Sequence, residues 1–470
     1  MKIKVIQSSW MAGNGYRLDT NPYLGGALEA KVLLEALALP KQFIRDLVSP
    51  EYGGIYFAGR ASVQWVESSD LGVPFLRGKD IQLADLSESP FISKQQVKEN
   101  PSFLIKKGMT LITRSGTIGK TGYVRADMDG MATSDPLRVV PDPQKIAPGY
   151  LYAYLSSKFG VPLVASGASG AIIQHLDPND IEDIPVPRLG VALEHEIHIL
   201  IERAAELRTK ATLGIHNARK KLHDYFGKPP TLKLGTRHPY WAGHAITSKQ
   251  VAEIGRLDTL FFNPLSCDLD EWLVNHSAGN KKLGEIAEVF DVPPFKHIYV
   301  GPEEGTPFFT SADLFDLDRV TDKYLSRGQT KGLQKYVLEE GWVLIARSGQ
   351  LNGNIGLPQL VDSGMAETTA SDHVIRIVPH DEEFSPGYLY AYLSLPEWRY
   401  SLIQRSATGA SIPALWPVYL NHIRILRPPT KLNKEVDVQV RKCLEMRVAA
   451  TKLDTEARER LEEALKESAN

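Results

Sequence analysis

Cysteine is nearly absent from this sequence of 470 residues, in which Cys267 and Cys443 are the only two. Two isolated cysteines make neither a disulfide framework nor a zinc knuckle, and their scarcity favours a reducing compartment. Long apolar runs are lacking too, since none approaches the roughly 20 residues that cross a bilayer. The first residues also lack the apolar core of a secretory signal. We therefore expect a cytoplasmic protein without a membrane span.

An excess of positive charge is missing as well, because 54 Lys and Arg residues stand against 56 Asp and Glu residues, a formal net charge of −2. This balance argues mildly against nucleic acid binding, since phosphate contacts usually call for a basic surface. It does not exclude such binding, because charge can be segregated onto one face and a partner subunit can supply part of the contact. The length itself predicts two or more domains.

Motifs that carry catalysis are also lacking. The segment Gly116-Thr117-Ile118-Gly119-Lys120-Thr121 looks like a phosphate-binding loop, but Arg114 occupies the place of its first glycine. A methyltransferase tetrapeptide is approached only by Asp291-Val292-Pro293-Pro294-Phe295, in which valine separates the acid from the prolines. His195 and His198 do not form a zinc-binding H-E-x-x-H pattern. We expect no catalytic residue, no metal and no cofactor bound by this chain.

An internal repeat, in contrast, runs through the sequence. The spacing between matching segments stays between 233 and 239 residues, which chance does not produce, so the chain is a tandem duplication. The stretch GALEAKVLLEALALPKQFIRDLVSPEYGG of the first copy has only a loose counterpart in the second. The matching pairs are Arg17-Leu18-Asp19-Thr20 with Arg256-Leu257-Asp258-Thr259, KKGMTLITRSG ending at Gly116 with EEGWVLIARSG ending at Gly349, Ser134-Asp135 with Ser371-Asp372, PGYLYAYLS from Pro148 with the same letters from Pro386, and GAIIQHL from Gly170 with GASIPAL from Gly409.

Each copy ends in a long polar segment with an apolar seam of coiled-coil spacing. In the first segment the seam is broken by Gly214 and resumes at Ala218. One helix from each copy would pair with the other; the alternative is that each helix packs only on its own domain. The seam residues are Leu193, Ile197, Leu200, Ala204, Leu207 and Ala211 in the first segment, and Val436, Val440, Cys443, Ala450, Leu453, Ala457 and Leu461 in the second.

These patterns divide the chain into five parts. Globular copies occupy 1–189 and 251–430, helical spacers occupy 190–228 and 431–470, and a turn-rich linker covers 229–250. Within each copy, short β-like runs alternate with Gly, Pro, Asp and Asn turn signals, so we expect an α+β fold made of two tandemly repeated mixed α/β domains. The YLYAYL helix, with a proline in its first turn, is expected to pack in the core rather than to stack on bases.

Polar residues in two turns of the first copy and one of the second suit DNA reading. Arginine has a planar fork for guanine edges or phosphate, Ser and Thr hydroxyls suit phosphate oxygens, and Asn or Gln pairs with adenine. The alternative is that the arginines cap carboxylates in tight turns. The framework repeats while the turn chemistry diverges, as two half-sites of different sequence require. The candidates are Arg77, Lys79, Arg114, Ser115, Thr117 and Lys120 in the first copy, and Arg347, Ser348, Gln350, Asn352 and Asn354 in the second.

The duplicated arrangement of VPFLRGKDI, KKGMTLITRSGTIGKTGYV, PGYLYAYLS and GAIIQHLDPNDIEDIPVP, followed by a long helix, resembles the specificity (S) subunit of Type I restriction–modification systems. The resemblance implies two target recognition domains separated by helices that pair as an antiparallel coiled coil. It also implies double-stranded DNA, modification (methyltransferase) subunits and restriction (motor-nuclease) subunits as partners, with S-adenosylmethionine bound by the methyltransferase. A different kind of function, a duplicated protein-interaction scaffold without DNA specificity, stays open.

Overall fold

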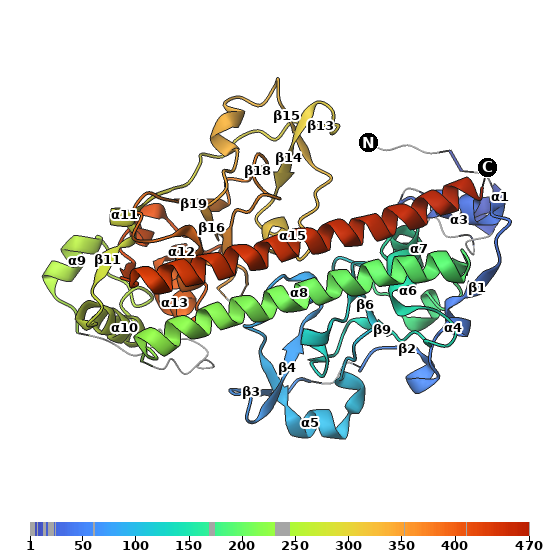
Figure 1. The fold of residues 1–470 in the computed structure, drawn as a ribbon, viewed down its shortest axis with the longest axis horizontal. Helices are drawn as coiled ribbons and strands as arrows, with labels where there is room; N and C mark the ends of the chain where they lie inside the picture. The colour runs from blue at the N-terminus through green and yellow to red at the C-terminus, as the bar shows by residue number, and fades with distance from the viewer. Residues whose placement is uncertain are drawn as a thin grey trace. The chain divides into compact units, whose positions relative to one another are not determined.

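The computed structural model describes residues 5–6, 8–12, 16, 23, 25–59, 62–168, 174–230, 245–351, 353–409 and 411–469 (Figure 1). Contacts divide the chain into two compact units: unit 1 is Met1–Thr209 with Ala449–Asn470, and unit 2 is Lys210–Val448. Each unit therefore joins one globular copy to a segment of each long helix. The first RLDT segment and most of the expected linker lie outside the described residues.

Unit 1 contains two four-stranded sheets and a two-stranded one. The larger sheet runs β2 (Ile55–Tyr56), β9 (Leu137–Val139), β6 (Thr110–Ile112), β7 (Thr121–Tyr123), with antiparallel neighbours throughout. The smaller sheet runs β3 (Trp65–Val66), β5 (Phe91–Ser93), β4 (Gly72–Leu76), β8 (Ala132–Thr133), and its β4–β8 pair is parallel. Strand β1 (Lys41–Phe43) pairs antiparallel with β10 (Pro185–Pro187).

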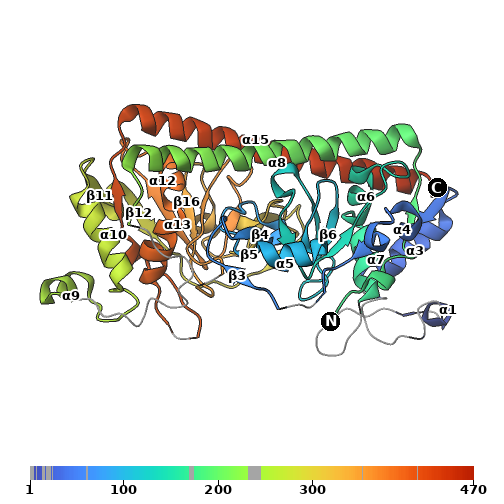
Figure 2. The same ribbon diagram turned by 90° about the horizontal axis from the view of Figure 1, so that it is seen from below.

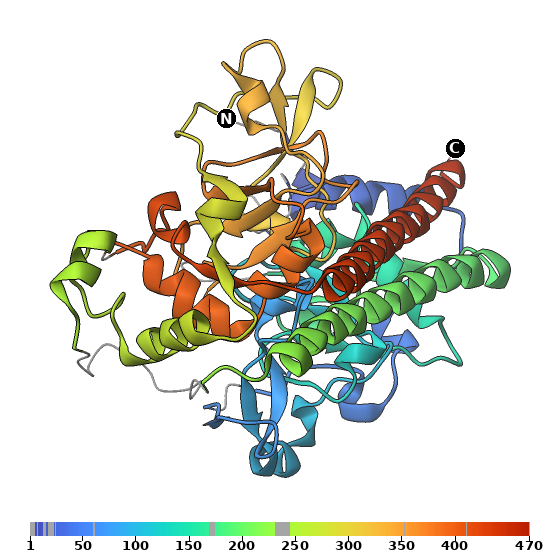
Figure 3. The ribbon, with the colours of Figure 1, turned by 60° about the vertical axis from the view of Figure 1, so that its left-hand side comes forward.

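Unit 2 repeats this topology strand for strand. Its larger sheet runs β12 (Ala287–Phe290), β19 (Val374–Pro379), β16 (Val343–Ala346), β17 (Pro358–Leu360). Its smaller sheet runs β13 (Tyr299–Val300), β15 (Tyr324–Ser326), β14 (Gly305–Phe309), β18 (Thr369–Ala370), again with one parallel pair (yellow to orange in Figure 3). Strand β11 (Asn280–Lys282) pairs with β20 (Arg424–Leu426). The predicted duplication and mixed α/β fold class are confirmed.

The start of the globular copy is duplicated as well, which corrects the expectation of only a loose counterpart. In unit 1, α3 (Ala27–Ala36) leads to β1 and then to α4 (Ile44–Leu47); in unit 2, α10 (Pro264–Asn275) leads to β11 and then to α11 (Leu283–Ile286). The repeat is weak in sequence because helix faces need only apolar residues at the right spacing. Shorter α-helices of the described residues are α1 (Ser8–Ala12), α5 (Lys94–Glu99), α7 (Gly160–Gly167), α9 (Ser248–Ile254), α13 (Pro396–Trp398) and α14 (Pro417–Leu420).

The YLYAYL segments form α6 (Pro148–Leu155) and α12 (Pro386–Leu393), each with proline in its first turn. Both helices are buried almost completely, so the expected core role is confirmed. In unit 1, the Tyr154 hydroxyl donates to the Pro185 carbonyl at 2.7 Å. In unit 2, the Tyr388 hydroxyl donates to the Leu426 carbonyl at 2.7 Å. The tyrosines thereby fix the strand that leads into each long helix.

The two long helices are α8 (Val191–Phe226) and α15 (Thr430–Glu467). Within unit 1 their segments lie side by side and antiparallel (Figures 1 and 2), because Arg460 reaches Glu196 at 3.3 Å while Arg208 reaches Asp454 at 2.7 Å. Arg208 and Asp454 are buried in the seam, so their ion pair fixes the helix register. The antiparallel pairing is therefore confirmed in this unit.

Within unit 2 the other two segments pair in the same way, and Gly214 does not interrupt α8. A Cβ atom at position 214 would lie 2.3 Å from the Cys443 sulfur, so the glycine makes room for that side chain. The Gln439 side-chain amide donates to the Gly214 carbonyl at 2.7 Å. The apparent break in the seam is thus a close contact between the helices. Among the described residues, no helix is long and apolar enough to cross a membrane.

The junction between α6 and α8 depends on a histidine acceptor. The Gly149 amide donates to His198 Nδ1 at 3.1 Å, whereas in unit 2 the Gly387 amide donates to an Asp437 carboxylate oxygen at 2.8 Å. Burial lowers the pKa of His198, which the neighbouring Glu202 carboxylate partly opposes. Nδ1 accepts a hydrogen bond only when it carries no proton, so the described junction requires neutral His198.

We predict that Gly214→Ala lowers the free energy of unfolding by roughly 1–2 kcal/mol, because overpacking outweighs the gain in helix propensity. Adding Cys443→Ala should restore most of that loss, because it removes the sulfur that the new methyl group meets. Urea unfolding monitored by circular dichroism would measure both effects. Leu213→Ala, at an exposed neighbouring position, is the control. Independent effects of the two substitutions would contradict the proposed contact.

We predict that His198 makes the protein less stable as the pH falls. Because the pKa of His198 is lowered in the folded state, the stability it contributes is complete above its unfolded pKa of about 6.5 and is lost as the pH falls toward the folded pKa. His198→Asn keeps an acceptor that does not titrate, so it should flatten the pH dependence of the thermal midpoint between about pH 7 and 5. An unchanged slope would show that His198 is not the responsible group.

Candidate nucleic-acid interface

In unit 1 the candidate turn joins β6 to β7 and is fastened by Thr113. The Thr113 backbone amide donates to the Lys120 carbonyl at 2.9 Å, and its hydroxyl oxygen accepts from the Lys120 amide at 3.0 Å. Gly116 and Gly119 have φ of 73° and 84°, a region that favours glycine. The Thr117 and Lys120 side chains are exposed on this turn. The strand ends therefore hold a rigid loop with an accessible tip.

Arg114 points into the protein rather than toward solvent. Its Nε donates to the Leu176 carbonyl at 2.9 Å, and its guanidinium lies 3.9 Å from the centre of the Phe57 ring. Arg114 Nη2 lies 2.5 Å from an Asp177 carboxylate oxygen, and the Arg114 side chain is 2% exposed. This geometry matches the alternative in which the arginine caps a carboxylate. It favours a framework role for Arg114, whose contact with DNA stays an untested prediction.

The second candidate turn of unit 1 lies beside the first. The Ser115 hydroxyl donates to Asp135 at 2.6 Å, and a Cβ atom at Gly78 would lie 3.8 Å from the same carboxylate oxygen. Arg77 forms a two-pronged pair with Asp80, with Nε–Oδ2 and Nη2–Oδ1 distances of 2.6 and 3.1 Å. Lys79 is exposed on the same turn. The structure thus brings the R-G-K-D and R-S-G turns together, as a shared contact surface requires.

In unit 2 the corresponding turn follows β16, and different residues contact its arginine. Arg347 pairs with Asp291 at 3.0 Å and lies 4.6 Å from the centre of the Trp416 ring. Trp416 occupies the repeat position of Asp177. Both framework arginines therefore have one carboxylate and one aromatic partner, but the segment that supplies the carboxylate in unit 1 supplies the aromatic ring in unit 2. Arg347 is therefore mainly a framework residue as well.

The remaining candidates of unit 2 differ in accessibility. Ser348 lies 3.3 Å from Nδ1 of His373, an exposed residue that sequence reasoning missed. Gln350 is exposed and Asn354 is partly buried. Asn352 lies outside the described residues. The side chains available at this edge are thus amide and imidazole groups, in place of the lysines of unit 1.

Beneath both turns lies a buried arginine that sequence reasoning also missed. Arg138 donates to the carbonyls of Pro136 and Thr133, the former at 3.1 Å. Arg376 donates to those of Val374 and Ala370, both at 2.9 Å. Burial lowers the pKa of each to about 10, so both stay protonated at neutral pH. Their only sequence signal is the repeated strand L-R-V or I-R-I, in which a charge stands between apolar residues.

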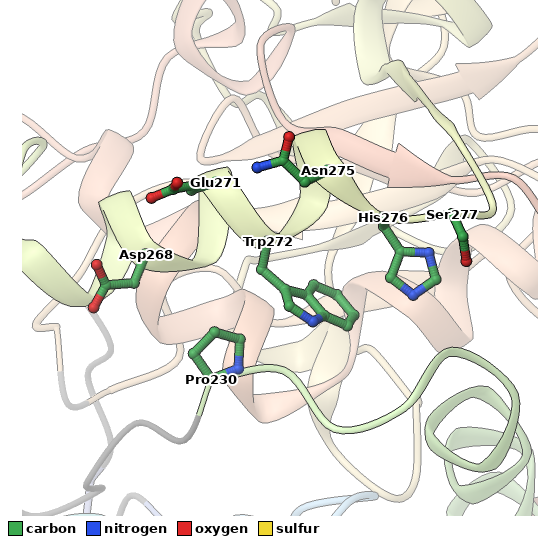
Figure 4. Close-up of a pocket in the computed structure, with 7 residues that line it drawn as sticks. All are labelled: Pro230, Asp268, Glu271, Trp272, Asn275, His276 and Ser277. Atoms are coloured by element: carbon green, nitrogen blue, oxygen red, sulfur yellow. The ribbon is translucent and has the colours of Figure 1, made fainter.

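An open pocket of unit 2, drawn in Figure 4, is a poor alternative site. Its exposed carboxylates, Asp268 and Glu271, would repel phosphate. The Trp272 and His276 rings lie beside each other, and both His276 nitrogens have partners: Nε2 at 2.9 Å from the Phe226 carbonyl and Nδ1 accepting from the Ala278 amide at 3.1 Å. Within the described ranges there is also no group of three or more His, Cys, Asp or Glu residues placed to hold a metal.

Comparisons with known proteins agree with the sequence motifs. No family model matches the chain. One curated relative, the Type I restriction enzyme EcoBI specificity subunit of Escherichia coli, is 24% identical over 155 residues, which span 33% of this chain and 33% of that protein. The matched segment is thus about a third of the relative's length.

Among solved structures, the S subunit of a Type I restriction–modification system from M. genitalium is similar at 14% identity and a TM-score of 0.34, covering 91% of this chain and 96% of that one. The HsdS subunit from Thermoanaerobacter tengcongensis is similar at 16% identity and a TM-score of 0.28, again covering 91% and 96%. In its motifs and in the segment matched to the curated relative, this chain resembles the specificity subunits of Type I restriction–modification systems.

Proposed function

We propose that this chain is the DNA sequence-specificity subunit of a Type I restriction–modification complex. The observation that carries the proposal is the contrast between a repeated framework and divergent turns. Arg114 and Arg347 occupy equivalent framework positions, yet the exposed side chains beside them are Thr117 and Lys120 in one unit and Gln350 in the other. A scaffold that binds one partner twice has no need of such divergence, whereas a reader of two different half-sites does.

In this proposal the globular copies at 1–189 and 251–430 are target recognition domains, and the helical segments 190–228 and 431–470 are spacers. Each domain reads one half of a bipartite target in double-stranded DNA, while the helices dock modification (methyltransferase) and restriction (motor-nuclease) subunits. The chain itself carries no catalytic group. S-adenosylmethionine is bound by the methyltransferase, and the complex works in the cytoplasm on cellular DNA.

In this proposal, phosphate contacts and base contacts are made by different residues. Lysines neutralise phosphates without regard to sequence, and unit 1 has Lys79 and Lys120 exposed at its edge. Amide side chains pair with adenine edges, and unit 2 has Gln350 there. The overall charge of −2 is compatible with this arrangement because basic side chains of the partner subunits add to the phosphate contacts.

The primary test is single-molecule sequencing for methyladenine in a host that expresses this chain with the methyltransferase encoded beside it. We expect a split motif, with two short specified blocks around a fixed unspecified gap. Omission of this chain alone should abolish the signal, because specificity resides in it. Unchanged methylation without the chain, or none with an expressed and cofactor-binding methyltransferase, would favour the scaffold function.

We further predict that Gln350→Ala relaxes the specified bases of one half-site only. Loss of a two-pronged amide contact costs discrimination of about 1–3 kcal/mol against the wrong base. Lys120→Ala, in contrast, should weaken binding to all sequences similarly and reduce the salt dependence by about one released counterion. Competition binding with randomised duplexes at several salt concentrations would separate the two effects. Equal behaviour of both variants would contradict the separation of roles.

A further inference from the structure

The turn that follows β16 in unit 2 is longer than its counterpart in unit 1. R-S-G is separated from the next matching glycine by residues 117–118 in unit 1 and by residues 350–355 in unit 2. In unit 1 the Thr113 hydroxyl fastens the turn, but Ala346 occupies that position in unit 2 and has no polar side chain. The longer turn therefore needs its fastening contacts from another part of the chain.

Two buried side chains of unit 2 supply these contacts. The Gln404 side-chain amide donates to the Leu351 carbonyl at 2.6 Å and to the Ile355 carbonyl at 3.1 Å. The Arg399 guanidinium donates to the Gly353 carbonyl, and its Nε donates to the Ile355 carbonyl at 3.2 Å. Gln404 is 5% exposed and Arg399 is 4% exposed, so this buried pair holds the turn from its inner side.

The contacts of the buried pair lie on both sides of the tip of the turn. The Gly353 amide donates to the Gln350 carbonyl at 2.8 Å, which closes a β-turn over residues 350–353. Asn352 within it lies outside the described residues. Leu351 packs against the hydrophobic core of unit 2, whereas the Gln350 side chain is exposed. The position of Gln350 therefore depends on the carbonyl contacts of its two described neighbours in this turn.

A single π-helical turn brings the buried pair to one side of its segment. It covers Arg399–Ile403, and the Gln404 amide donates to the Arg399 carbonyl, five residues earlier. In an α-helix, residues five apart point about 140° away from each other, whereas a turn closed between residues i and i+5 brings them close together. Such turns are rare and occur frequently at functional sites.

The corresponding helix of unit 1 has small or apolar residues at these positions. Helix α7 places Val161 and Ala165 against the turn at Gly119, whereas in unit 2 the buried pair lies against the matching Gly356. The second copy also has one residue more between PGYLYAYLS and the next Gly-Ala, as a helical turn of five residues in place of four requires. The longer turn and the donors that hold it thus occur in the same unit.

We propose that Gln404 and Arg399 are positioning residues that determine the base preference of the half-site read by unit 2. The inference rests on the function proposed above. A two-pronged contact between an amide side chain and adenine requires a fixed distance and direction, and the buried pair holds the backbone that carries Gln350. Because both side chains are buried, they act through the turn and make no base contact themselves.

The test uses the full chain in complex with its methyltransferase and a labelled duplex carrying the split motif, competed by duplexes with single base changes in either half-site. Gln404→Met keeps a side chain of similar length but removes its N–H donors. It should reduce discrimination about tenfold at one half-site only, the one that Gln350→Ala also affects. Arg399→Met should act in the same direction. In the Gln350→Ala background, Gln404→Met should change discrimination by less than about twofold, because both substitutions remove the same contact.

Ser406→Ala is the matched control. The Ser406 hydroxyl is buried in the same segment and donates to the Leu402 carbonyl at 3.1 Å, so its removal costs a buried hydrogen bond without releasing the turn. Its base preference should equal that of wild type. Thr113→Val removes the hydroxyl that fastens the turn of unit 1 and should relax the other half-site instead.

A purely structural role of Gln404 would lower the affinity for every duplex by the same factor and leave the base preference intact. That result, or an unchanged preference, would overturn the inference while the proposed function stands. A further loss of discrimination in the Gln350→Ala background, or a loss at the half-site that Thr113→Val affects, would overturn it as well. A wild-type complex that does not distinguish the motif from its base-changed duplexes would overturn both.

Discussion

The hydrogen bonds between buried tyrosine hydroxyls and the strand before each long helix are the contacts on which the rest of each unit depends. Strand β10 or β20 pairs with only one other strand, so without a second attachment it would leave the helix that follows it free to swing. Tyr154 and Tyr388 supply that attachment from the core helices α6 and α12. Burial raises the pKa of both hydroxyls, so they remain donors throughout the physiological pH range. The direction in which each long helix leaves its globular copy is thereby fixed.

A few buried hydrogen bonds also hold the exposed turns in place. Arg138 and Arg376 satisfy backbone carbonyls that the short strands leave unpaired, and Arg114 and Arg347 bind the neighbouring loop segments. Because these four arginines face inward, the turns keep their backbone shape without help from the side chains at their tips. Exposed positions such as Thr117 and Gln350 are then free to differ between the copies at little cost in stability. A protein that recognises two different DNA sequences needs contact residues that are separate from the residues that maintain its fold.

Much of this organisation could be predicted from the sequence, because a tandem repeat reveals the architecture even when neither copy has a catalytic motif. The long helices, the core role of YLYAYL and the strands around R-S-G follow from periodicity and turn residues. The contacts of two single residues could not be predicted. Gly214 is interpreted as a break until the Cys443 sulfur is placed against it. For Arg114 the sequence leaves DNA contact and carboxylate capping open, and it does not identify Asp177 and Phe57, which come from distant parts of the chain. Local patterns contain no information on such tertiary partners.

Because the chain is duplicated, its two copies can be compared with each other. This comparison separates the residues that the fold requires from those that it does not. A residue that is buried and repeated, such as Arg138 with Arg376, is retained by the fold. A residue that is exposed and different, such as Thr117 against Gln350 on the corresponding turn, is not required by the fold and can specify a partner.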